Sequence, residues 1–203
     1  MIITTEKLNS GKVKIYGDGE YLFSVPAIIW FASDLSEDSE INEEELLSLK
    51  AEGDSSFAYE SALRMLTMRS HSKKELYGKL RMKYGAAAAA DAVDKCEELG
   101  LIDDEKFARY YASELYERKH FSAPRILAEL NMKGIDREIA ENTVNTLDID
   151  SDRAIICIIN KMRLDFPLSD RDRNRAVRRL VSMGYSFSEI KKQLDTAGYE
   201  SSI

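Results

Sequence analysis

Five arginines gather in one short stretch near the C-terminus, and they are the side chains best suited to chemistry with another molecule. They are Arg171, Arg173, Arg175, Arg178 and Arg179. At the rotation of an α-helix, Arg171, Arg175 and Arg178 fall within about 60° of one another, opposite a face centred on Leu180. Guanidinium groups present planar sets of donors that fit phosphate or carboxylate oxygens. The alternative is a solvated face on which the arginines pair with the aspartates between them.

A second basic stretch lies one hundred residues earlier. Its members are Lys73, Lys74, Lys79, Arg81 and Lys83, of which Lys73 and Lys83 are predicted to lie nearer the buried side of their helix. We expect the two stretches to face a groove and to contact an anionic partner. The competing interpretation, a solvated helix face, applies here as well.

No catalytic arrangement is evident from the residue types and their spacing. His71 and His120 are both predicted at turns between helices, without the cysteines or carboxylates that a metal site needs. The chain has no GxGxxG, P-loop or GxSxG motif. The sequence therefore predicts a protein that is not an enzyme, with no catalytic residues, no metal and no cofactor.

The elements that must position these side chains recur with a period of fifty residues. Without any gap, Leu80, Leu130 and Leu180 coincide, and the capping-type residues Ser72, Ser122 and Asp172 coincide as well. Apolar positions in register at a fixed period are typical of a tandem array. We predict three units of three short helices each, at 57–102, 103–150 and 151–203, which stack to bury their apolar faces.

The first 56 residues follow a different pattern. Alternating polar and apolar residues at 2–8, 12–16 and 20–25, with a Gly-Asp-Gly turn, predict strands. Pro26 suits the first turn of a helix to about Ala32, and Asn42 with Glu45 predicts a capping box for a helix ending near Lys50. We predict a linker at 51–56, and a module that packs Trp30 and Phe31 onto the first helical unit.

Charge is distributed unevenly along the chain. The net charge is -7, but residues 1–56 hold 4 basic and 12 acidic side chains, whereas residues 151–203 hold 10 basic and 7 acidic ones. An acidic total therefore does not exclude local contact with phosphates. The apolar runs are too short to span a bilayer, and no secretory segment is evident, so we expect a cytoplasmic protein without membrane contact.

Three segments carry a resemblance to a known family. They are SHSKKELYGKLRMKYG at 70–85, LGLIDDEKFARYYASE at 99–114 and SAPRILAELNMKGIDREIAENTV at 122–144. In this order and spacing they resemble the RecX family, bacterial regulators of the RecA recombinase. The similarity is strong over about residues 57–147 and weaker over the third unit. The segment with Gly19, Tyr21 and Phe23-Ser24-Val25 resembles the N-terminal extension of longer, Gram-positive-type members.

The resemblance implies a mainly α-helical fold: three tandem, helix-turn-helix-like units in an elongated, curved array behind a small N-terminal strand module. It also implies binding to RecA and to the RecA–DNA filament, with inhibition of recombinase, ATPase and coprotease activity in DNA repair, homologous recombination and the SOS response. Direct contact with single- or double-stranded DNA, and a monomeric state, are further expectations. Two alternatives stay open: a DNA-binding helical repeat that acts without RecA, and a scaffold that binds protein only.

Overall fold

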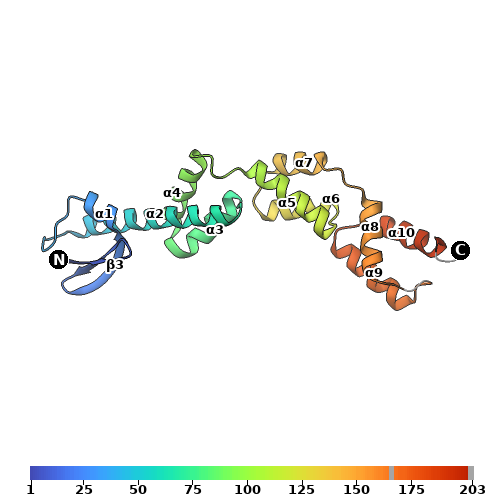
Figure 1. Ribbon diagram of the computed structural model, residues 1–203, viewed down its shortest axis with the longest axis horizontal. Coiled ribbons are helices and arrows are strands. Elements are labelled where there is room, and N and C mark those ends of the chain that lie inside the picture. The colour runs from blue at the N-terminus through green and yellow to red at the C-terminus, as the bar shows by residue number, and fades with distance from the viewer. Residues whose placement is uncertain (165–166, 201–203) are drawn as a thin grey trace. The chain divides into compact units, whose positions relative to one another are not determined.

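The computed structural model describes residues 1–164 and 167–200, and the chain divides into two compact units, Met1–Asp103 and Asp104–Ile203. The first unit opens with an antiparallel sheet of three strands in the order β1-β2-β3 (Figure 1). The strands are β1 Ile3–Leu8, β2 Lys12–Gly17 and β3 Glu20–Pro26. The three predicted strands are thus confirmed, and Pro26 ends β3 and caps the following helix instead of lying within it.

Helices α1 (Ala27–Ala32) and α2 (Glu43–Met68) follow the sheet. The Asn42–Glu45 capping box is present, but the predicted end near Lys50 and the predicted linker at 51–56 are wrong, because α2 continues without a break. Gly53 shows the physical reason: a Cβ there would lie only 2.5 Å from Val25 Cγ1. The contact between α2 and β3 keeps this stretch helical despite its polar sequence.

A first core lies between the sheet and the start of α2. Ile3, Val13, Ile15 and Val25 contribute from the strands, together with Trp30 and Leu49 from the helices. The prediction that Phe31 packs inward with Trp30 is wrong, since Phe31 is 65% exposed. In a helix as short as α1, only one side faces the sheet, and Trp30 occupies it.

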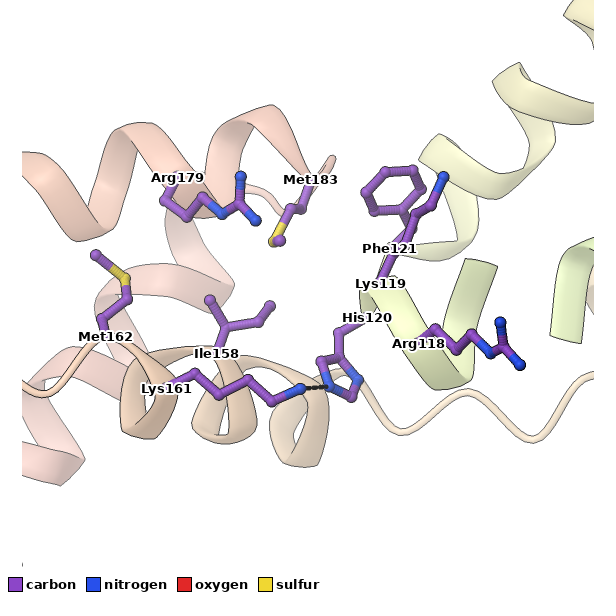
Figure 2. A pocket seen from close by; sticks show the side chains of 9 residues that line it. All are labelled: Arg118, Lys119, His120, Phe121, Ile158, Lys161, Met162, Arg179 and Met183. Carbon is purple, nitrogen blue, oxygen red and sulfur yellow. Dashed lines mark hydrogen bonds between the residues drawn. The ribbon is translucent and has the colours of Figure 1, made fainter. Parts of the chain in front are cut away.

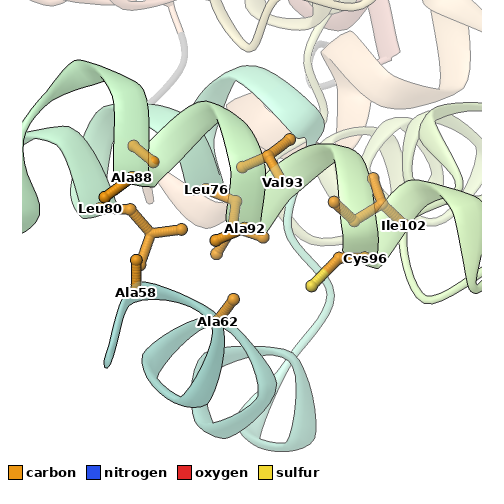
Figure 3. Close-up of a cluster of buried hydrophobic side chains, with 10 residues drawn as sticks. Ala58, Ala62, Leu76, Leu80, Ala88, Ala92, Val93, Cys96 and Ile102 are labelled. Atoms are coloured by element: carbon orange, nitrogen blue, oxygen red, sulfur yellow. The ribbon is translucent and has the colours of Figure 1, made fainter. Parts of the chain in front are cut away.

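The second half of α2 packs with α3 (Lys73–Tyr84) and α4 (Ala86–Glu98). Their shared core includes Ala58 and Ala62 of α2, and Leu76 and Leu80 of α3 (Figure 3). The alanine-rich start of α4 supplies Ala88, Ala89 and Ala92 to the same core. The small side chains allow α4 to approach α2 closely. The predicted boundary at 56/57 therefore falls inside α2, which serves two cores.

The second unit is helical over its described residues. It contains α5 (Asp104–Lys119), α6 (Ala123–Met132), α7 (Arg137–Thr146), α8 (Ser151–Lys161), α9 (Asp170–Ser182) and α10 (Phe187–Glu200). Helices α5, α6 and α7 surround one core, and α8, α9 and α10 surround another. Tyr116 and Phe121 pack against both cores, and so they join the two sets of helices.

The fifty-residue register describes the buried positions well. Leu80, Leu130 and Leu180 have no exposed surface, and neither do the equivalent residues Leu76, Ile126 and Ala176. Only the assignment of Asp172 as a cap is wrong. Ser169 caps α9 by accepting a hydrogen bond from the Asp172 backbone N–H, because the loop before α9 places a serine three residues earlier. The fold is mainly α-helical as predicted; the proposed unit boundaries remain a prediction.

Candidate anion-binding surface

Helix α9 separates an apolar face from a basic one, as the sequence indicates. Ala176 and Leu180 are buried, whereas all five arginines of the helix are exposed. Two of the five are held by acids: Arg173 lies 3.4 Å from Asp195, and Arg175 lies 3.5 Å from Asp172. Within residues 1–164 and 167–200, the other three, Arg171, Arg178 and Arg179, form no ion pair.

The basic side chains of α3 have more internal partners. Lys73 is half-buried and forms ion pairs with Glu97 and Asp94 of α4, and Lys79 lies 3.5 Å from Glu75. Lys74, Arg81 and Lys83 are exposed, so the expectation that Lys83 lies near the buried side is wrong. Lys83 instead extends over the Tyr84 ring, 4.9 Å from its centroid. Helix α3 ends at Gly85, and the basic side chains of its last turn, Arg81 and Lys83, are exposed to solvent.

The α3 residues belong to the first compact unit and the α9 residues to the second. Of the ten predicted site residues, Arg179 lines a pocket. That pocket, which we call the joint pocket, has a volume of about 420 Å³ and lies where the end of α5 meets α8 and α9. The expected groove lined by both basic stretches stays a prediction, since the stretches lie in different units.

Both basic and apolar side chains line the joint pocket (Figure 2). Its polar lining consists of Arg118, Lys119, His120, Lys161 and Arg179, and its apolar lining of Phe121, Ile158, Met162 and Met183. None of the described residues that line it is an aspartate or glutamate. Arg118 pairs with Glu114, but Lys119, Lys161 and Arg179 form no ion pair with the described residues, and such unneutralised cations attract an anion.

Hydrogen bonds between the α5–α6 turn and the α9–α10 turn stabilise the joint pocket. The Tyr185 hydroxyl donates to the His120 carbonyl at 2.7 Å, and the Ser122 backbone N–H donates to the Met183 carbonyl at 3.1 Å. His120 adopts φ 55, in the left-handed region that histidine tolerates better than most residues. The turn between α5 and α6 is therefore fixed by contacts with the turn between α9 and α10.

The His120 ring lies beside the Lys161 side chain in the joint pocket. Lys161 Nζ lies 2.7 Å from His120 Nε2, the contact drawn in Figure 2. Burial lowers the pKa of His120, and the Lys161 ammonium group lowers it further, while the Tyr116 carbonyl opposes both. With Lys161 as an ammonium group, which can only donate, Nε2 of the neutral ring accepts a hydrogen bond from it.

Sequence reasoning missed this pocket and treated His120 as an isolated turn residue. Lys161 lies at the end of α8, and no local pattern distinguishes it. The signal available was the half-turn of three consecutive basic residues at 118–120, just before the Ser122 cap. Only the packing of α8 and α9 against that turn shows that the charges converge.

No metal or membrane site is present in the part of the chain that the structure describes. No group of three or more His, Cys, Asp or Glu side chains there could hold a metal ion. The same residues include no helix long and apolar enough to cross a bilayer.

The three-helix units, the basic outer face and the joint pocket define a class: helical-repeat proteins with clustered surface cations. Comparisons with known proteins identify the family. Residues 58–96 match the model of the first three-helix domain of RecX, and residues 103–144 match the model of the second. The chain belongs to the RecX family, and it is a non-enzymatic regulatory protein that modulates the RecA recombinase.

Relatives and a solved structure extend the match along the chain. Regulatory protein RecX of Bacillus velezensis is 29% identical, covering 98% of this chain and 77% of its own. Regulatory protein RecX of Chlorobium phaeobacteroides is 30% identical, covering 71% of this chain and 96% of its own. A crystal structure of regulatory protein RecX superposes with a TM-score of 0.60 over 95% of this chain and 97% of the other, at 20% identity, which supports the fold.

Proposed function

We propose that this protein binds RecA and the RecA–DNA filament directly, as a cytoplasmic monomer, and lowers recombinase, ATPase and coprotease activity during DNA repair, homologous recombination and the SOS response. The observation that carries the proposal is the outer face of α9. Its arginines are exposed, and Arg171, Arg178 and Arg179 form no ion pair among the described residues. A filament presents both DNA phosphates and protein carboxylates, which are the groups that guanidinium donors bind.

The α3 surface adds a smaller contribution in this proposal. Lys74, Arg81 and Lys83 are exposed and available to an anionic partner. Lys73 and Lys79 already interact with carboxylates, and a partner would have to displace those ion pairs. We therefore assign RecA or DNA contact chiefly to the third unit.

The distribution of charge argues that RecA itself supplies most of the affinity. Residues 1–56 hold 12 acidic and 4 basic side chains, which repel a phosphate backbone. A filament surface that includes protein tolerates this repulsion better than bare DNA does. The acidic module and the basic α9 face thus favour a mixed protein–DNA target.

A titration of RecA's ATPase activity on single-stranded DNA tests the proposal. Substoichiometric amounts of the full chain should lower the rate of ATP hydrolysis, and strand exchange should fall in parallel. Rates that stay unchanged when binding measurements show the filament to be fully occupied would contradict the proposed inhibition. A filament that does not bind the protein at all would contradict the proposed partner contact.

A DNA-binding function without RecA is the second candidate, favoured by the absence of carboxylates from the joint pocket's lining. It predicts tight binding to bare DNA, with a log–log salt slope of about -0.9 for each duplex phosphate that is neutralised. A protein-only scaffold, the third candidate, predicts that alanine at Arg171, Arg175 and Arg178 leaves DNA and filament binding intact. The salt titration and this triple variant separate the three functions.

A further inference from the structure

With Lys161 in its ammonium form, the contact between His120 and Lys161 has one consistent arrangement of protons. At 2.7 Å the two nitrogens share a hydrogen bond, and the Lys161 ammonium group has no lone pair with which to accept one. His120 Nε2 must accept, so the ring is neutral in this state. A protonated ring would bring two donors and two positive charges together.

An anion resolves that conflict. An oxygen placed between the two groups accepts one hydrogen bond from the lysine and one from the imidazolium ring, and its charge offsets both. Arg179 and Lys119 line the same pocket and add further donors. Arg118 contributes least, because it is 79% exposed, lies 3.5 Å from Glu114 and points away from His120 in Figure 2.

We propose that the joint pocket binds a phosphate group of a nucleic-acid backbone, and that binding is coupled to protonation of His120. Phosphate matches the pocket because several donors converge from different helices on one space of about 420 Å³. The apolar side chains Ile158 and Met183 limit water around the ligand, which strengthens each charged contact. This inference deepens the proposed function by naming a ligand, but it requires only the isolated protein.

The charged and titratable groups around His120 come from every helix that packs against its turn. They are Glu117, Arg118 and Lys119 of α5, Arg153, Cys157 and Lys161 of α8, Arg179 of α9, and the hydroxyls of Tyr116 and Tyr185. Glu117 is the one carboxylate among them, and with Arg153 it lines a second hollow that His120 also borders. The surroundings are therefore net positive, which disfavours the protonated ring until an anion enters.

The direction of the pH effect follows from this balance. The pKa of His120 is lowered in the free protein by burial and by Lys161, and a bound phosphate raises it. Between these two pKa values, each binding event takes up one proton. Affinity therefore increases as pH falls through this interval, by at most about tenfold for each pH unit.

The test uses the full chain and two probes, a fluorescein-labelled oligothymidylate and inorganic pyrophosphate. Anisotropy titrations from about pH 8 to about pH 6, at constant ionic strength, give the pH dependence of affinity. Calorimetry with pyrophosphate, in two buffers that differ in ionisation enthalpy, counts the protons taken up on binding. Circular dichroism of each variant reports whether it has folded.

Two variants remove one partner each, and two others serve as matched controls. His120→Asn abolishes the titration and retains a residue that tolerates positive φ; Lys161→Met removes the ammonium group. His71→Asn changes the other histidine of the chain, and Lys191→Met removes an exposed lysine of α10. We expect Lys161→Met to weaken binding about tenfold, His120→Asn to flatten the pH dependence, and both controls to behave as the wild type.

The competition experiments distinguish a nucleic-acid backbone from an acidic protein segment as the ligand. Oligonucleotide binding that pyrophosphate displaces supports the nucleic-acid backbone. Displacement by an oligo-glutamate peptide but not by pyrophosphate would overturn the proposal in favour of an acidic protein segment. The same pH dependence in His120→Asn, or wild-type affinity in Lys161→Met, would also overturn it. RecA ATPase inhibition is measured separately, so either proposal fails without the other.

Discussion

The turns that carry the two histidines occupy similar places in successive units but have different neighbours. His71 precedes α3 and is buried at 4% exposure, with Nδ1 3.5 Å from Glu75 Oε2, too long for a good hydrogen bond. His120 precedes α6 and has Lys161 Nζ at 2.7 Å from its ring. Burial is the main cause of a lowered pKa in both. The Glu75 carboxylate thus offsets positive charge at the turn before α3, whereas the turn before α6 keeps the positive charge of Lys161 for a ligand.

Helices α3 and α9 repeat the same contrast on a larger scale. Both bury a leucine at the centre of one face, Leu80 and Leu180. Two lysines of α3 interact with acids, whereas three arginines of α9 form no ion pair within the described residues. A cation with an internal partner must give it up to bind another, so the difference favours α9 as the binding face.

The largest expected effect tests whether the two helices are equivalent inside. Leu80→Ala and Leu180→Ala should each lower the free energy of unfolding of their own unit by about 3 kcal/mol, because both side chains are fully buried. Urea denaturation followed by circular dichroism measures each loss. A loss below about 1 kcal/mol at either position would show that its core relaxes around the cavity.

The turns after these helices should respond unequally to the same substitution. Gly85 and Gly184 both have positive φ, but a Cβ at Gly85 meets no atom within 4 Å, whereas one at Gly184 would lie 2.4 Å from Ser122 Oγ. Gly85→Ala should cost about 1–3 kcal/mol from backbone strain alone. Gly184→Ala should cost more, because Ser122 and Arg125 must also move away from the new Cβ. Equal losses in thermal denaturation would show that Ser122 and Arg125 move aside freely.

The outer faces are compared by removing three charges from each. Alanine at Arg171, Arg175 and Arg178 should weaken filament binding about tenfold and reduce the log–log salt slope by up to about 2.7, since each lost duplex contact counts for about 0.9. The matched variant has alanine at Lys74, Arg81 and Lys83 of α3, and should weaken binding less. Thermal stability should change little in both, because exposed charges contribute little to folding. A greater loss from the α3 variant would reverse the comparison.

The smallest effect concerns pH. Both histidines have a pKa lowered in the folded state, so the unfolded chain binds protons first as pH falls. Stability should be constant above the unfolded pKa of about 6.5 and should decrease as pH falls from there through the folded pKa values. NMR titration of the two rings measures the shifts. Added pyrophosphate should raise the pKa of His120 and leave that of His71 unchanged.

Local patterns in the sequence predicted most of the helices and strands. The serine caps at Ser72 and Ser122 are present, and the glycine at 85 ends its helix as expected. The incorrect predictions concern residues whose structure depends on contacts with a distant segment of the chain. The linker at 51–56 is helical because Gly53 packs on Val25, and Phe31 is exposed because the sheet accommodates only Trp30.

The candidate site was predictable to a smaller extent. The α9 arginines are adjacent in the chain, and their exposure follows from helical periodicity around Leu180. The joint pocket combines Lys119 and His120 with Lys161 and Arg179, which are forty to sixty residues further along the chain. Sequence spacing carries no information on which side chains of separate helices converge.

The sequence by itself determined the repeated three-helix pattern, the buried leucines and the basic outer face of α9, because periodicity and capping act within a few residues. It also identified the family, because its motifs keep their order. Only the tertiary structure decided which cations keep internal partners and which converge around His120. Those outcomes depend on how helices pack, and packing places residues from distant segments within hydrogen-bonding distance.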